Sequence, residues 1–121
     1  MKPETLMIDD VKYVRADAVK ETAETLDGMP YKIVRCDRTG VFAGHVEARN
    51  GREVVIRKAR RLWYWSGAAS LSQLAMEGTK KPGECKFPCE VDRVVVLDAI
   101  EILDVTAQAK SSIDGVTVWA Q

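Results

Sequence analysis

Eleven residues near the middle of the chain combine side chains that would bind an anionic molecule carrying a flat ring. This segment, residues 57–67, holds four cations, two of the three tryptophans, a tyrosine and a glycine. Guanidinium groups form forked hydrogen bonds to phosphate or carboxylate, and indole rings supply a stacking surface. The sequence therefore predicts a ligand site made of Arg57, Arg60, Arg61, Trp63, Trp65, Ser66 and Gly67.

Each part of the segment has a predicted role. Arg60 or Arg61 would bind phosphate, and Trp63 or Trp65 would stack on a base. Backbone N–H groups that follow Ser66 and Gly67, where a helix is expected to begin, would add donors for an anion. The alternative is that the tryptophans fill the core and the arginines are solvated. We favour a ligand site or an interface, because two tryptophans and a tyrosine exceed what one small core usually takes.

No catalytic centre can be assembled from the sequence. Ser66 lies at an expected strand-to-helix turn, but the G-x-S-x-G pattern is missing and the only histidine, His45, belongs to a different strand. Cys85 and Cys89 have a spacing that zinc accepts, but a four-ligand site would also need Cys36 and His45. We therefore expect no catalytic residue, no metal and no cofactor, and the sequence favours a binding protein over an enzyme.

Composition narrows the possible partners. The chain has 121 residues with 18 cations and 18 anions, so no overall field attracts nucleic acid, and nucleic-acid binding is not expected. Residues 49–61 carry six cations and one anion, whereas residues 90–104 carry five anions and one cation. This asymmetry suits an anionic small molecule or head-to-tail self-association. The acidic stretch is interpreted as a solvated strand face: Asp92, Asp98, Glu101 and Asp104.

The expected location is the cytoplasm. No stretch approaches the roughly 20 apolar residues that cross a bilayer, and the N-terminus lacks the charged-then-apolar pattern of a signal peptide. Three cysteines, an odd number, argue against a secreted disulfide framework.

The expected fold is α+β in one domain, residues 1–121, mainly an antiparallel meander with two or three short helices. Residues 1–30 form an N-terminal arm or helix, with a strand at 11–14 and a helix over 16–26, and residues 31–121 form the β-rich body. Asn50-Gly51 between two strand-like runs is the strongest hairpin signal. The remaining elements are expected as strands at 31–36, 41–48, 53–63, 91–103 (one bent or two short) and 116–119, and helices at 68–77 and 106–113, the first capped by Ser66 and ended by Gly78.

The stretch from Ala59 to Ala75, ARRLWYWSGAASLSQLA, resembles a family of small phage and prophage proteins of uncharacterised function. Further matching residues are Gly78, Pro82, Cys85-Lys86-Phe87 and Ile100-Glu101-Ile102-Leu103. The resemblance implies a phage origin and expression in a bacterial cytoplasm, and it brings no catalytic residues. Small phage proteins of this kind are often virion parts, DNA-binding accessories or inhibitors of host immunity.

These observations leave several functions open. The first is a non-enzymatic sponge that sequesters a nucleotide-type immune signal, either a cyclic nucleotide or an ADP-ribose-like molecule, as a homo-oligomer. The second is a structural or protein-interaction module, such as a virion component or an inhibitor that docks on a host protein. Nucleic-acid binding and catalysis follow in that order.

Overall fold

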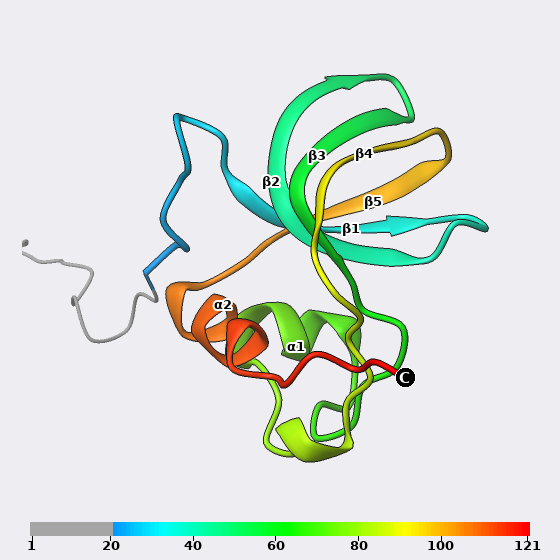
Figure 1. Ribbon diagram of the computed structural model, residues 1–121. Helices are drawn as coiled ribbons and strands as arrows, with labels where there is room; N and C mark the ends of the chain where they lie inside the picture. The colour runs from blue at the N-terminus through cyan, green and yellow to red at the C-terminus, as the bar shows by residue number, and fades with distance from the viewer. Residues whose placement is uncertain (1–20) are drawn as a thin grey trace, which may run out of the picture.

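Residues 21–121 are described by a computed structural model, which contains one antiparallel sheet and two short α-helices (Figure 1). The strands lie in one half of the molecule and the helices in the other. The expected α+β class is confirmed. The elements are β1 (Tyr31–Cys36), β2 (Val41–Asn50), β3 (Glu53–Arg61), α1 (Leu71–Glu77), a 3-10 turn (Pro82–Glu84), β4 (Val91–Val96), β5 (Ala99–Asp104) and α2 (Ala107–Asp114).

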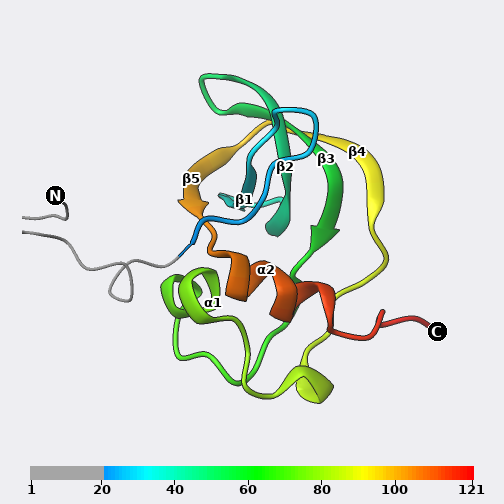
Figure 2. The ribbon, with the colours of Figure 1, turned by 90° about the vertical axis from the view of Figure 1, so that its left-hand side faces the viewer.

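The sheet is strongly curled because consecutive strands occupy its two edges. The strand order is β4-β3-β2-β1-β5, yet only Leu97 and Asp98 connect β4 to β5. Such a short link spans roughly 10 Å at full extension, so the two edges must approach one another. Figure 2 shows β4 and β5 bending towards each other above α2. Residues 91–103, which were expected to form either one bent strand or two short strands, therefore form two strands.

Strand β1, which lies between β2 and β5 in the sheet, separates two buried clusters. Ile33 packs with Leu74, Phe87 and residues of α2 between the sheet and the helices. Its neighbour Val34 points the other way, into the curled sheet, where Ile56 is also buried. Because successive side chains of a strand face opposite sides, a strand covered on both faces needs apolar residues at consecutive positions.

The expected hairpin between β2 and β3 is confirmed, with its turn one residue further along the chain. Asn50 pairs with Glu53, so Gly51 and Arg52 are the two turn residues. Of these, only Gly51 has a positive φ, 62°. Glycine is favoured at the first central position of a turn with this pattern.

Gly44 in β2 makes a close backbone approach to β3. A Cβ added there would lie 2.6 Å from Ile56 Cγ2 and 2.9 Å from the Arg57 carbonyl oxygen. The register of β2 against β3 also shifts between Ala43 and His45. A bulge and a close backbone approach, the two usual reasons for a glycine inside a strand, are therefore both present at Gly44.

The expected helix over residues 16–26 is wrong in its described part. Residues 21–26 form only isolated bridges, Thr22 to Thr106 and Leu26 to Met29. The main chain instead pairs with the segment that opens α2, where the Ala23 N–H donates to the Val105 carbonyl at 2.9 Å. Tertiary pairing has overridden helix propensity here. The strand expected at 11–14 lies outside the described residues.

Two further boundaries differ from expectation. Helix α1 begins after Ser70, whose hydroxyl accepts from the Gln73 N–H at 3.1 Å, so Ser70 and not Ser66 is its N-cap. Gly78 ends α1 with a φ of 79°, as expected. Helix α2 is capped by Thr106, the residue at which the second helix was expected to begin. At the C-terminus the expected strand is a single parallel bridge between Phe87 and Val118.

Within residues 21–121, no helix is long and apolar enough to cross a membrane.

Candidate functional site

A pocket of about 330 Å³ lies where β3 leaves the sheet, and three residues of the predicted site line it. Arg61, Trp63 and Trp65 meet there with residues of the loop between β1 and β2. None of the described lining residues is acidic, and two are arginines. This volume is at the lower end of the range for small-molecule sites, enough for one nucleotide-sized unit. The full lining is Arg38, Thr39, Gly40, Val41, Arg61, Leu62, Trp63 and Trp65.

The guanidinium group of Arg61 is held in place on two sides. Its Nη1 donates to the Thr39 carbonyl oxygen at 2.5 Å, and its Cζ lies 4.3 Å from the centre of the Phe42 ring. A guanidinium group has five N–H donors in a planar fork. Donors of Arg61 therefore stay available for an anion after the bond to Thr39 is made.

The loop that completes the pocket is fixed by Asp98. The carboxylate accepts hydrogen bonds from the Arg38 N–H at 2.7 Å, the Thr39 N–H at 3.1 Å and the Thr39 hydroxyl at 2.6 Å. These bonds, chiefly those from Thr39 and then from Arg38, lower the pKa of Asp98 below its ordinary value. Burial, followed by the effect of Asp98, raises the pKa of the neighbouring Cys36 thiol to about 11. The sequence placed Asp98 on a solvated strand face. In the structure its carboxylate instead holds the loop between β1 and β2.

Trp63 is exposed and supported from one side. Its side chain is 59% exposed, and Trp119 stacks on it with ring centroids 5.3 Å apart and planes at 15°. The Lys86 ammonium lies 5.8 Å from the Trp63 ring centre and 5.7 Å from that of Trp119. The C-terminal segment is held there because the Trp119 N–H donates to the Phe87 carbonyl at 2.9 Å. The ring of Trp63 is thus presented to the pocket by contacts that are distant in sequence.

Ser66 and Gly67 have structural roles in this fold, and Trp65 reaches the pocket from a partly buried position. Trp65 is partly buried and packs against the cluster between sheet and helices. The Ser66 hydroxyl donates to a Glu84 carboxylate oxygen at 3.2 Å. Gly67 has a φ of 82°, and a Cβ there would lie 2.4 Å from the Lys81 nitrogen. Because the N-cap of α1 is Ser70, four residues after Ser66, the expected helix-start donors do not follow Ser66 and Gly67.

Arg60 is a scaffold residue. It is 7% exposed, and its guanidinium group donates to the carbonyls of Ile113 at 2.9 Å and Val116 at 2.7 Å. Two further bonds reach the carbonyls of Phe87 and Pro88, both at 3.1 Å. Ile113 lies in the last turn of α2, where the helix dipole favours a cation. Arg60 therefore joins β3 to α2 and the C-terminal segment, and it does not line the pocket.

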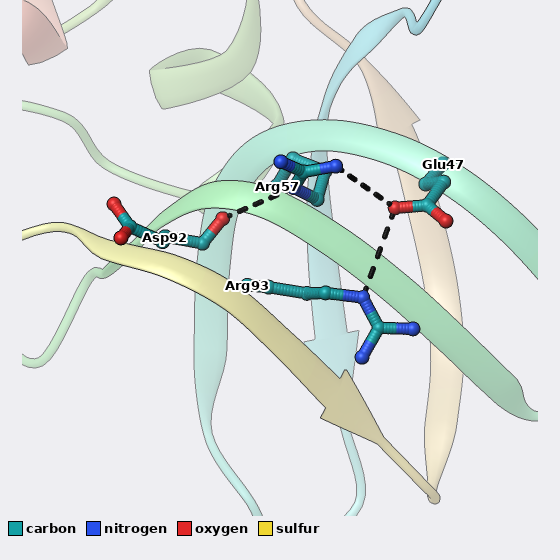
Figure 3. Close-up of polar contacts among 4 residues, drawn as sticks. All are labelled: Glu47, Arg57, Asp92 and Arg93. Atoms are coloured by element: carbon teal, nitrogen blue, oxygen red, sulfur yellow. Dashed lines mark hydrogen bonds and ion pairs between the residues drawn. The ribbon is translucent and has the colours of Figure 1, made fainter.

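Arg57 also lies away from the pocket, on the outer face of the sheet (Figure 3). Its Nη1 is 3.3 Å from a Glu47 carboxylate oxygen, and Arg93 on β4 approaches the same oxygen at 3.8 Å. Arg57 Nε donates to the Asp92 carbonyl at 3.3 Å. Arg57 and Arg93 are directly opposite across the strands, a repulsive placement that Glu47 offsets.

A larger pocket, about 520 Å³, lies between the β2–β3 turn and β5. Arg49 and Arg52 line it, but so does Glu101, and no aromatic side chain is among its described lining residues. A nucleotide site needs a ring surface as well as cations. On chemical grounds we therefore assign the candidate site to the smaller pocket, which contains both.

The residues considered for metal binding or catalysis have other partners. His45 is buried with Nδ1 3.0 Å from the Met29 carbonyl oxygen, and its ring meets Tyr31 edge-on. Cys36 and Cys85 are buried and Cys89 is exposed, all as free thiols. Within residues 21–121 no three acidic, histidine or cysteine side chains are grouped so that they could hold a metal ion.

The sequence did not single out Arg38 and Thr39, which line the pocket, or Asp98 and Trp119, which support it, as site residues. Each reaches the site through contacts between distant parts of the chain. One signal was present for Trp119, since it is the third tryptophan of a chain whose other two lie in the predicted site.

The fold and the site define a small α+β protein with an open, cationic and aromatic pocket. A family model described as "Domain of unknown function (DUF6948)" matches residues 29–113, and the chain belongs to this family. Comparison with curated proteins found no significant match. Comparison with solved structures likewise found none.

Proposed function

We propose that this protein is a non-enzymatic binding protein that sequesters an anionic, ring-bearing small molecule of the nucleotide type. The observation that carries this proposal is the joint presence of Arg61, Trp63 and Trp65 in one acid-free pocket. Guanidinium groups bind phosphate well, and an exposed indole such as that of Trp63 can stack on a base. Within residues 21–121, no grouping of side chains suggests an acid, a base and a nucleophile acting together on the ligand.

In its biological setting the protein would act as a phage-encoded counter-defence sponge in the bacterial cytoplasm. The resemblance of residues 59–75 to small phage and prophage proteins supports this setting. A cyclic nucleotide or an ADP-ribose-like molecule would be the sequestered immune signal. Trp63 is widely exposed beside the pocket, which fits a homo-oligomer in which a second copy covers this ring and closes the site.

Isothermal titration calorimetry tests the proposal. Wild-type protein is titrated with cyclic dinucleotides and ADP-ribose, and with adenosine as a ligand that lacks phosphate. We expect heat from at least one phosphate-bearing ligand, with unchanged ligand recovered afterwards. Arg61→Gln should weaken that binding at least tenfold, because a hydrogen bond to a charged group contributes about 1.5–3 kcal/mol. No heat across all ligands would remove the proposal.

Exposed aromatic residues support a second candidate, a module that docks on another protein. Trp63, Tyr64 and Trp119 are exposed on one surface around Lys86. Tryptophan, tyrosine and arginine are the residues most enriched where binding energy concentrates in protein interfaces. Affinity purification from infected cells separates the candidates. A stoichiometric protein partner without a small molecule would favour docking on a host or virion protein.

A further inference from the structure

The loop between β1 and β2 is hydrogen-bonded to the turn between β4 and β5, about 60 residues further along the chain. Asp98, in the two-residue turn between β4 and β5, receives three hydrogen bonds from Arg38 and Thr39. Its own carbonyl accepts from the Asp37 N–H at 2.9 Å. Both backbone and side chain of one aspartate therefore fix three consecutive loop residues.

The same loop is connected directly to the pocket arginine. The Thr39 carbonyl oxygen accepts from Arg61 Nη1 at 2.5 Å, while the Thr39 hydroxyl donates to Asp98. Thr39 thus lies between the carboxylate that holds the loop and the guanidinium group that would bind the ligand. A displacement of the loop would move both pocket arginines.

Arg38 is the residue that this arrangement brings to the pocket. Its N–H is bonded to Asp98, and its side chain lines the pocket together with Arg61. Among residues 21–121, no side chain forms an ion pair with the Arg38 guanidinium group, which is exposed. Two arginines facing one acid-free pocket favour a ligand group with more than one negative charge.

We infer that Arg38 is the second anion-binding side chain of the pocket, that it recognises the diphosphate of a nucleotide together with Arg61, and that Asp98 is its positioning residue. This inference rests on the proposed function and identifies the chemical class of the ligand. Each guanidinium fork matches one phosphate group, so a diphosphate engages both arginines, a monophosphate one of them, and a nucleoside neither.

Calorimetry with ADP-ribose, AMP and adenosine tests this assignment at fixed ionic strength. We expect wild-type affinity to fall in that order. Arg38→Gln should weaken ADP-ribose binding about tenfold and leave AMP binding less affected. Arg49→Gln, which removes the same charge at the far β2–β3 turn, is the matched control and should change binding little. Equal losses for both variants, or no loss for Arg38→Gln, would overturn the role of Arg38.

A double-mutant cycle tests the role of Asp98. Asp98→Asn should weaken ADP-ribose binding in the wild-type background and have a smaller effect in the Arg38→Gln background, where only its action on Arg61 through Thr39 remains. Residues that act through one another give such non-additive effects. Thr39→Val removes only the hydroxyl bond and is a milder second variant, and Asp92→Asn is the charge-matched control. Additive losses would contradict positioning, whereas wild-type protein that binds none of the three ligands would instead remove the proposed function.

Discussion

Trp119 stacks on Trp63 at 5.3 Å, so a residue near the C-terminus supports an indole at the candidate pocket. The support depends on a chain of contacts. Arg60 binds the Val116 carbonyl at 2.7 Å, and the Trp119 N–H binds the Phe87 carbonyl at 2.9 Å. The buried Arg60 therefore fixes the segment that carries Trp119, and the half-buried Arg61 next to it in sequence faces the pocket.

Replacing the supporting ring should loosen Trp63. We expect Trp119→Ala to lower the free energy of unfolding by about 0.5–1.5 kcal/mol beyond the loss of buried area, the usual contribution of an aromatic pair. The near-ultraviolet circular dichroism of the stacked indoles should also diminish. Val118→Ala, at an exposed neighbouring position, is the control and should alter neither signal. An unchanged spectrum of Trp119→Ala would show that the stacked pair does not form in solution.

Removing Arg60 should damage the whole fold. Arg60→Met removes the hydrogen bonds that Arg60 donates to four carbonyl groups, and we expect the free energy of unfolding in urea to fall by about 3–5 kcal/mol. Arg60→Lys should recover only a small part of this, since an ammonium group cannot reproduce the fork. Arg49→Met, at an exposed position, should change stability by no more than about 0.5 kcal/mol. Equal stabilities of Arg60→Met and the control would contradict the scaffold role.

Gly67 should tolerate no side chain. Its positive φ and the 2.4 Å separation between an added Cβ and the Lys81 nitrogen require the backbone to move. We expect Gly67→Ala to cost about 1–3 kcal/mol or more in thermal unfolding, combining conformational strain with the clash. Gly83→Ala is a suitable control, because a Cβ there meets no atom within 4 Å. A wild-type melting temperature for Gly67→Ala would show that this turn is wrongly placed.

Asp98 should make stability depend on acid pH. Its folded-state pKa lies below 3.8, so the ionised form is stabilised by folding. This contribution is fully present above the unfolded-state value and is lost as pH falls through the folded-state value. The difference in unfolding free energy between wild type and Asp98→Asn should be constant near pH 6 and shrink below pH 3.8. A difference that stays constant through this acid range would contradict the hydrogen bonds to Arg38 and Thr39.

The sequence predicted local features well. Asn50-Gly51 marked the hairpin, and Thr106 and Gly78 marked helix ends, because each of these signals acts over a few residues. Ser66 and Ser70 are equally good caps by residue type, so the sequence could not choose between them. In the structure the turn at Gly67 packs against residues 79–81, and the helix begins only after Ser70.

Arg60 is buried against α2 and Arg61 lines the pocket. This difference could not be predicted from the sequence, because it depends on an irregular residue in β3. Lys58 has a positive φ of 51°, and the register against β2 shifts beside it. Ala59 consequently packs inside the curled sheet with Ile56, and Arg60 turns towards α2. A bulge changes which side chains face each side of a sheet. A prediction that assumes regular alternation of side chains along β3 cannot locate such a bulge.

The most direct test is native mass spectrometry of the protein purified from phage-infected bacteria, compared with Arg61→Gln purified in the same way. We expect wild-type subunits of 13.5 kDa to assemble into an oligomer that retains a phosphate-containing small molecule, which the variant loses while it keeps the same assembly. Wild-type protein that carries no small molecule under these conditions, or equal retention by the variant, would contradict a ligand site formed by the arginine and tryptophan residues of this pocket.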